Sequence, residues 1–290
     1  MSTAHDHTHH HSGPHGPHQP DGDTGLAEIL DLDAEVLAEH IASIVSSLPL
    51  ESEPRHIVDL GCGTGAGTFA LLERFPGARV TAVDTAADHL RLVREKAGAR
   101  GVGDRVRTVR ADLDTAPWPD LGTPDLVWAS ASLHHLARPD RALADVRGLL
   151  APGGLIAVVE LGGFPRFLPA EVPEDRPGLE ERAHAAVDRH HTEHLPHRGA
   201  DWGPMLAAAG FTVEDTRTIT VEIEDDGGGA VGRYAHAALR RLRGAAAPAL
   251  GPEDLAALDE LLAADSPRGV LRRGDLALRT ERTVWAARRP

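Results

Sequence analysis

Between residues 56 and 160, short β-rich runs alternate with stretches of helical period. The β-rich runs lie at 56–60, 79–83, 105–109, 125–129 and 154–160, and helical patterns occur at 68–75, 86–98 and 139–150. Strands separated by helices form βαβ units, which build a parallel sheet with helices on both faces. We therefore predict an α/β fold with a doubly wound sheet.

Composition narrows the class of protein further. The chain has 290 residues and a formal net charge of −14, and an acidic surface opposes binding to nucleic acids and anionic membranes. No apolar run approaches the roughly 20 residues that span a bilayer, so we expect no membrane segment. The single cysteine, Cys62, cannot form an internal disulfide, and the first residues lack the apolar core of a signal peptide. Both features favour the cytoplasm.

The beginning of the chain has a different character. Residues 1–25 contain seven of the 18 histidines and almost no apolar side chains, which predicts a disordered His-rich tail. Weak metal affinity of this tail is chemically plausible, but a solvated segment is the interpretation that we favour. Apolar residues at helical spacing then predict an N-terminal helix over 26–50.

The regular alternation ends at residue 161. We predict a cofactor-binding core at 55–161 within a domain of residues 26–290, and two irregular segments, 161–200 and 225–280, as a helical cap over the substrate. Between and after them, a strand is expected at about 211–223 and a last strand at 282–287. Asp201 is a plausible N-cap for a helix that begins at Trp202.

A glycine cluster joins the first predicted strand to the first predicted helix. In the run from Asp59 to Gly65, glycines permit a positive φ and let a ligand approach the backbone closely. Asp84 ends the second strand, 23 residues after Gly61, where a carboxylate can accept hydrogen bonds from a ribose. Asp112 follows the third strand at the same edge of the sheet. Three acidic groups at successive strand ends predict a ligand pocket.

A dinucleotide-binding oxidoreductase is the competing interpretation, because Gly61, Gly63 and Ala66 also fit a loose NAD(P) fingerprint. Asp59 opposes it, since a carboxylate there would repel a pyrophosphate but could bind the ammonium of an amino-acid-like ligand. A non-catalytic protein that binds a cofactor or a metal also remains open.

These blocks together resemble the class I S-adenosylmethionine-dependent methyltransferases. The resemblance runs from about residue 55 to 161 and includes VDLGCGTG, Asp84, ADL at 111–113, DLVWAS at 125–130 and LLAPGGLIAVVE at 149–160. It implies a Rossmann-like sheet of seven strands, the last one antiparallel. It also implies S-adenosylmethionine as cofactor and S-adenosylhomocysteine as product, with the following cofactor-binding residues: Asp59, Gly61, Gly63, Gly65, Asp84, Asp112, Leu113, Ala129 and Ser130.

The resemblance implies methyl transfer by direct displacement to a small molecule, through an oxygen, nitrogen or carbon nucleophile. His134 and His135 follow the fourth strand, and one of them could act as a general base or orient the acceptor. The alternative is that both pack beside the cofactor. We expect a monomer or homodimer with a small-molecule acceptor, no nucleic-acid partner and no membrane partner.

A second histidine group contains His190 and His194, which would share one face of a helix. Because the usual zinc-protease spacing is absent, a polar cap helix is favoured and no metal site is predicted. Core packing is the expected role of Trp202 and of the only tyrosine, Tyr234.

Overall fold

A computed structural model describes the backbone of residues 20–191, 197–225 and 229–290. The prediction of a disordered tail therefore lies outside the described residues for positions 1–19, and so does His194. The first helix begins at Pro20, which is earlier than the tail boundary predicted at residue 25.

A single sheet of seven strands forms the centre of the protein, in the order β3-β2-β1-β4-β5-β7-β6. Strands β1 to β5 are parallel, and β7 runs antiparallel to both of its neighbours, which confirms the predicted fold class. The strands are β1 (His56–Leu60), β2 (Arg79–Asp84), β3 (Val106–Arg110), β4 (Leu126–Ser130), β5 (Leu155–Leu161), β6 (Thr212–Glu224) and β7 (Ala277–Arg288).

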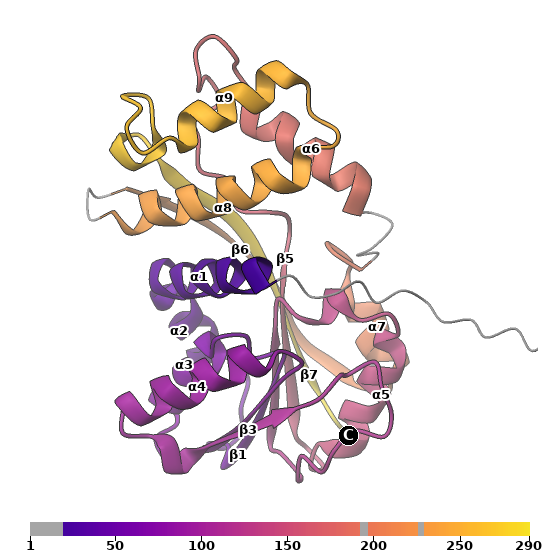
Figure 1. Ribbon diagram of the computed structural model, residues 1–290. Coiled ribbons are helices and arrows are strands. Elements are labelled where there is room, and N and C mark those ends of the chain that lie inside the picture. Colours follow the sequence, from indigo (N-terminus) through magenta and orange to yellow (C-terminus); the bar gives the residue numbers. More distant parts are fainter. Residues whose placement is uncertain (1–19, 192–196, 226–228) are drawn as a thin grey trace, which may run out of the picture.

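Helices cover both faces of the lower half of this sheet (Figure 1). One face packs against α2 (Ala38–Ser46), α3 (Ala66–Arg74) and α4 (Ala87–Ala99). The other packs against α5 (Pro139–Leu149) and α7 (Trp202–Ala208). The central strands are apolar on both faces because neither face meets water. Trp202 is fully buried, and the Asp201 side chain accepts the Gly203 N–H, so both expectations for this helix are confirmed.

The upper half is built on the far ends of β6 and β7. These two strands pair along their whole length, from Thr212 opposite Arg288 to Glu224 opposite Ala277, and extend well beyond the parallel strands. Three helices pack around this extension and share an apolar core with it: α6 (Leu179–His191), α8 (Ala230–Ala246) and α9 (Pro252–Leu262). Tyr234 is buried in this core, as expected, and all three helices lie within the predicted cap segments.

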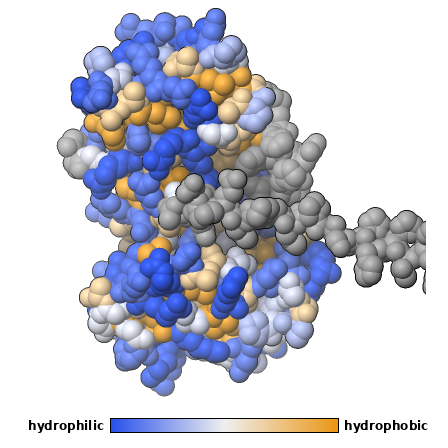
Figure 2. Space-filling model, viewed as in Figure 1, coloured by the Kyte–Doolittle hydropathy of each residue, from blue (hydrophilic) through white to orange (hydrophobic). Residues whose placement is uncertain are grey.

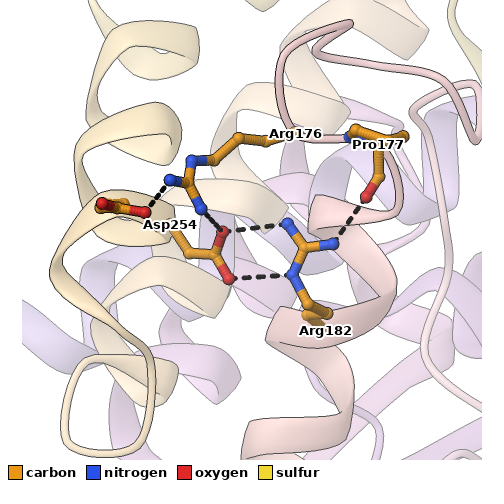
Figure 3. A network of polar contacts seen from close by, with 5 residues as sticks. Arg176, Pro177, Arg182 and Asp254 are labelled. Carbon is orange, nitrogen blue, oxygen red and sulfur yellow. Dashed lines mark hydrogen bonds and ion pairs between the residues drawn. The ribbon is translucent and has the colours of Figure 1, made fainter.

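A charged network fastens α6 to α9 (Figure 3). The Arg182 guanidinium in α6 donates two hydrogen bonds of 2.9 Å to the Asp254 carboxylate in α9. Arg176 donates a third to the same carboxylate at 3.3 Å and also pairs with Glu253. Arg182 further donates to the Pro177 carbonyl at 2.6 Å, so one side chain joins two helices and the loop before α6.

The predicted N-terminal helix over 26–50 is wrong as a single element, because the chain forms α1 (Pro20–Val36) and α2 with a break at Leu37. The break separates two sets of contacts. Leu32 and Leu37 are buried in the core of the upper half, whereas Ile44 and Val45 are buried in the core of the lower half. The first part of this segment therefore packs on the upper half and the second part on the lower half.

As a result, α1 lies across the boundary between the two halves. Four ion pairs hold it there: Asp31 with Lys96 in α4, Glu28 with Arg240, Glu35 with Arg233, and Asp33 with Arg282. Of these ion pairs, one joins α1 to the lower half and three join it to α8 and β7.

Figure 2 shows one face of the molecule, on which blue hydrophilic side chains interrupt the orange apolar ones. Among the described residues, the large apolar side chain that stands exposed is Leu271, at 49%. No described helix combines the length and the apolar character that crossing a bilayer requires.

Candidate functional site

The glycine loop folds back onto the end of the neighbouring strand. The Cys62 N–H donates to the Val83 carbonyl at 2.9 Å, which draws the loop over the end of β2. Gly61 has a φ of +68°, and a Cβ atom on it would lie 2.4 Å from the Cβ of Ser132. Glycine is therefore required at this position for both backbone conformation and space.

Asp84 connects this loop to β2. Its Oδ2 accepts the Gly63 N–H at 2.9 Å, and its Oδ1 accepts the Ala86 N–H at 2.8 Å and lies 3.4 Å from His89 Nδ1. Burial alone would raise the pKa of the Asp84 carboxyl, but the hydrogen bonds from His89 and the two backbone groups outweigh burial and lower it. The group is thus held as a carboxylate beside the glycine loop.

Asp59 occupies a different environment. Its side chain is 2% exposed and accepts a hydrogen bond of 2.6 Å from the Thr68 hydroxyl in α3. Burial, with a smaller repulsion from Asp84, raises the pKa of Asp59 to about 7 in spite of that bond. A cation placed nearby would restore the charge of this carboxyl, which fits the predicted ammonium partner.

The loop after β4 closes the other side of the site. Ala129 is fully buried, and Ser130 ends the strand. The next residue, Ala131, has a φ of +50°, which is costly for a side chain other than glycine. The Ser132 hydroxyl then donates to the Leu60 carbonyl at 2.8 Å, so the β1 and β4 loops are bonded to each other.

Asp112 and Leu113 lie after β3 and are not bonded to the groups above. The Asp112 carboxylate accepts hydrogen bonds from Asp114 N and Thr115 Oγ1, both at 3.0 Å, within its own turn. Leu113 is partly buried, and its carbonyl accepts from Trp118 Nε1. Their predicted role in binding an adenine stays a prediction.

His134 and His135 sit in a short 3-10 helix, η2 (Leu133–His135), but in unlike surroundings. His134 is 5% exposed, and its Nδ1 lies 2.6 Å from Oε2 of Glu160, which is 3% exposed. The other oxygen, Oε1, accepts the N–H groups of Leu133 and His134 at 2.9 and 3.3 Å. Since a carboxylate only accepts hydrogen bonds, Nδ1 is the donor and Nε2 is left as the basic nitrogen.

His135 is exposed, and its ring centroid lies 4.2 Å from that of His134. Partial desolvation, followed by repulsion from His134, lowers the pKa of His135 to about 4. His135 is therefore neutral at pH 7, and His134 has the better-oriented ring.

Four residues of the site were not singled out from the sequence: Thr68, His89, Ser132 and Glu160. Glu160 could have been found, because it is a carboxylate one residue before the end of an apolar strand, a signal close to the one that identified Asp84. The other three act through contacts between separate elements. Among the described residues, no group of three or more His, Cys, Asp or Glu side chains is arranged to hold a metal ion.

Comparison with protein-family models matches residues 57–154 to a family described as a methyltransferase domain. The matched segment begins inside β1 and ends just before β5. It contains the glycine loop, Asp84, Asp112 and both histidines of η2.

Two curated proteins illustrate the likeness of sequence. The trans-aconitate 2-methyltransferase of Paracidovorax citrulli is 41% identical over 117 residues, which are 40% of this chain and 42% of that protein. The demethylmenaquinone methyltransferase of Thermus thermophilus is 40% identical over 119 residues, 41% of this chain and 53% of that protein. The chain thus spans about half the length of the curated relatives it matches.

Solved structures extend the likeness of fold beyond this segment. YcgJ of Bacillus subtilis is 15% identical with a TM-score of 0.52 and covers 86% of this chain and 98% of its own. An O-methyltransferase family protein from Burkholderia thailandensis is 22% identical with a TM-score of 0.52. The superposition covers 70% of this chain and 57% of that protein. At these identities the structures show a shared fold. Residues 57–154 are thus similar to a methyltransferase domain, and they lie in a chain that shares its fold with these solved structures.

Proposed function

We propose that the protein transfers a methyl group from S-adenosylmethionine to a small-molecule acceptor by direct displacement. The observation that carries the proposal is the bonding of the glycine loop to Asp84. It combines a backbone that only glycine permits at Gly61 with a carboxylate at the end of β2. This arrangement supports recognition of a ribose beside a compact, phosphate-free ligand.

The residues at this edge fit the cofactor. An ionised carboxylate has about four acceptor positions. Oδ2 of Asp84 accepts the Gly63 N–H and retains the capacity to accept a second hydrogen bond, from a ribose hydroxyl. A Cβ atom on Gly63 would lie 3.1 Å from Leu30 in α1, so glycine keeps the loop open below that helix. When bound, S-adenosylmethionine supplies an electrophilic methyl group on a sulfonium.

The remaining cofactor contacts are proposed from the family resemblance. Asp59 would bind the amino group, Asp112 and Leu113 the adenine, and Ala129 and Ser130 would lie under the methionine part. The first of these contacts is supported by the raised pKa of Asp59, since a neighbouring ammonium would favour ionisation of this buried group.

His134 is the side chain that we propose to accept a proton from an acceptor that carries one. Glu160 holds its Nδ1, and an imidazole oriented in this way can take up a proton at Nε2. His135 would line the same site as a neutral side chain. An acceptor without an acidic proton would need neither function, and methyl transfer would then depend on alignment.

The class of acceptor is proposed to be a compact metabolite. The two curated relatives are named for trans-aconitate and demethylmenaquinone, which differ in chemistry, so an oxygen, nitrogen or carbon nucleophile fits the likeness equally. The net charge of −14 supports a protein without nucleic-acid or anionic-membrane partners. We also propose a cytoplasmic protein that acts as a monomer or homodimer.

Calorimetric titration with S-adenosylmethionine, S-adenosylhomocysteine and NAD tests the proposal. We expect micromolar binding of the two sulfur compounds and none of NAD. Asp84→Ala should weaken binding about 100-fold or more because it removes the ribose acceptor and frees the glycine loop. Asp88→Ala is the matched control, since that carboxylate lies nearby on α4 but is 67% exposed and pairs with Arg91.

Thermal denaturation of both variants separates lost binding from lost folding. Binding of NAD alone would instead support an oxidoreductase and overturn the proposal. If none of the three compounds binds to the folded protein, a non-catalytic role is favoured.

A further inference from the structure

Lys96 is the only lysine of the chain, and it lies where three parts of the structure meet. It belongs to the last turn of α4. Its ammonium donates to Oδ1 of Asp31 in α1 at 2.5 Å and to the Thr64 carbonyl in the glycine loop at 3.0 Å. One side chain therefore joins the first helix of the chain to the loop that we propose to bind the cofactor.

The bond to Thr64 fixes one peptide group of the glycine loop, the one between Thr64 and Gly65. Its carbonyl accepts from Lys96, and its N–H donates to the Cys62 carbonyl at 2.9 Å. The residues Gly63 and Gly65 have φ values of +52° and +98°, which glycine adopts without strain. Because glycine also has the most conformational freedom of any residue, the loop depends on such bonds to keep its shape.

The α1 helix touches the same loop. A Cβ atom on Gly63 would lie 3.1 Å from a methyl group of Leu30, the residue before Asp31. The helix thus meets the loop directly through Leu30, and through the Lys96 ammonium by way of Asp31. A change in the shape of the loop reaches α1 by both routes.

The ion pairs of α1 with the two halves of the molecule differ in burial. On the side of the upper half, the Asp33 carboxylate accepts hydrogen bonds of 2.7 Å from the Tyr234 hydroxyl and the Arg282 guanidinium. The side chains of Asp33 and Arg282 are 22% and 10% exposed, against 44% and 30% for Asp31 and Lys96. Water screens the more exposed pair more strongly. The contact at Lys96 is therefore the one that opens more easily.

We propose that Lys96 is a positioning residue for the cofactor, which couples the glycine loop to the docking of α1. The loop that it bonds carries the Gly63 N–H, the donor to the proposed ribose ligand Asp84. Since the break at Leu37 separates α1 from α2, α1 can move while α2 stays in the lower core. A docked α1 strengthens cofactor binding, and by linkage a bound cofactor keeps α1 docked. The proposal rests on the proposed function for the identity of the bound molecule as S-adenosylmethionine.

Lys96→Met removes the ammonium and keeps the length of the side chain. S-adenosylhomocysteine should bind about 10-fold more weakly to this variant, because a charged hydrogen bond that shapes the loop is lost. Most of the change should be a faster dissociation rate, measured by displacing labelled S-adenosylhomocysteine with an excess of the unlabelled compound. The melting temperature should fall by no more than about 4 °C, since an exposed ion pair contributes little to stability.

Arg91→Met is the matched control on the same helix. The Arg91 side chain is 51% exposed and pairs with Glu95 at 2.8 Å within α4, so its loss touches neither α1 nor the glycine loop. This variant should bind and release S-adenosylhomocysteine as the wild type does.

Hydrogen–deuterium exchange of the α1 amides, residues 20–36, separates coupling from simple stabilisation. S-adenosylhomocysteine should slow this exchange in the wild type. In Lys96→Met the effect should be lost, even at concentrations of S-adenosylhomocysteine that saturate the variant. If Lys96 were only structural, α1 would exchange faster in the variant and the ligand would still slow it.

Asp31→Asn removes the other partner of the ion pair and completes a double-mutant cycle. The two substitutions should not be additive, so the double variant should bind S-adenosylhomocysteine about as weakly as Lys96→Met alone. The proposal is overturned if Lys96→Met keeps the affinity and the dissociation rate of the wild type, or if the ligand still slows exchange of its α1 amides. A wild type that does not bind S-adenosylhomocysteine would contradict the proposed function, and this inference with it.

Discussion

Two sets of buried polar groups, one in each half of the molecule, differ in how they are paired. At the carboxyl edge of the parallel strands, Asp59, Asp84 and Glu160 each accept hydrogen bonds from the protein itself. In the upper half, the ring nitrogens of His184 and the Thr280 hydroxyl are buried without a hydrogen-bond partner in the described structure. The lower site is thus held in shape before any ligand arrives, whereas each unpaired group in the upper half costs about 1–3 kcal/mol.

A substitution in the glycine loop of the lower half should have the largest effect on stability and on cofactor binding. Gly61→Ala would place a Cβ atom 2.4 Å from Ser132 in a residue with a φ of +68°. We expect a loss of about 3–5 kcal/mol in the free energy of unfolding, from backbone strain and overpacking combined. Urea denaturation measures the loss, and calorimetry should show that S-adenosylmethionine binding is abolished.

Gly98→Ala is the matched control in the same half, because nothing lies within 4 Å of its Cβ position in α4. It should be neutral or stabilising by up to about 1 kcal/mol. If Gly61→Ala and Gly98→Ala are equally stable, the glycine loop is not packed as tightly as we infer for the lower site.

Asp59→Asn should separate stability from binding within the lower half. The folded pKa of Asp59, about 7, lies above the ordinary value of 3.8, so the folded state binds the extra proton and loses stability as the pH rises through 7. The asparagine variant has no such titration. It should be more stable than the wild type at pH 8, on the order of a few kcal/mol, with little difference at pH 4.

The same variant should bind S-adenosylmethionine more weakly at pH 8, because a neutral amide cannot replace the carboxylate beside an ammonium. Urea denaturation at both pH values and calorimetry provide the measurements. A variant less stable than the wild type at pH 8 would contradict this account of Asp59.

The upper half should respond least, through the α6–α9 network in Figure 3. Hydrogen bonds from Arg182 lower the pKa of Asp254, so this carboxylate stabilises the fold above its ordinary pKa and ceases to do so as the pH falls below it. Since Arg182 is 42% exposed, Asp254→Asn should cost only about 1 kcal/mol at pH 7. The difference should shrink as the pH falls below 3.8.

Asp265→Asn, an exposed carboxylate after α9, serves as the control and should change nothing. Affinity for S-adenosylmethionine should be the same in both variants. If Asp254→Asn greatly weakens the binding of S-adenosylmethionine, the α6–α9 network of the upper half also affects the cofactor site of the lower half, which would contradict this prediction.

Prediction from sequence succeeded where the determining contacts are local. Asp84 ends a strand and the glycines follow one, and the carboxyl ends of parallel strands meet at one edge, so spacing alone brought Gly63 and Asp84 together. The break at Leu37 escaped prediction, because the helical period continues through it. On either side of the break the chain packs against two different cores, which are formed mostly by residues from elsewhere in the chain.

The groove beside α6, which is lined in part by His184, Arg198 and Thr280, could not be predicted for a related reason. His184, Arg198 and Thr280 come from a helix, a loop and a strand, and no spacing along the chain connects them. The last strand was predicted at 282–287 but begins at Ala277. The added length comes from pairing with β6, whose partner residues lie more than 50 positions away.

The sheet order also decides whether residues 57–154, the segment that matches the methyltransferase domain, could fold alone. The family match ends at residue 154, yet β4 pairs with β5, which begins at Leu155. A fragment cut at that boundary would leave β4, with its apolar sequence LVWAS, as a bare edge. Such an edge is a template for aggregation. The part of the chain that is easiest to recognise is therefore not a part that could be handled separately, and any heterologous expression has to carry the chain through β7.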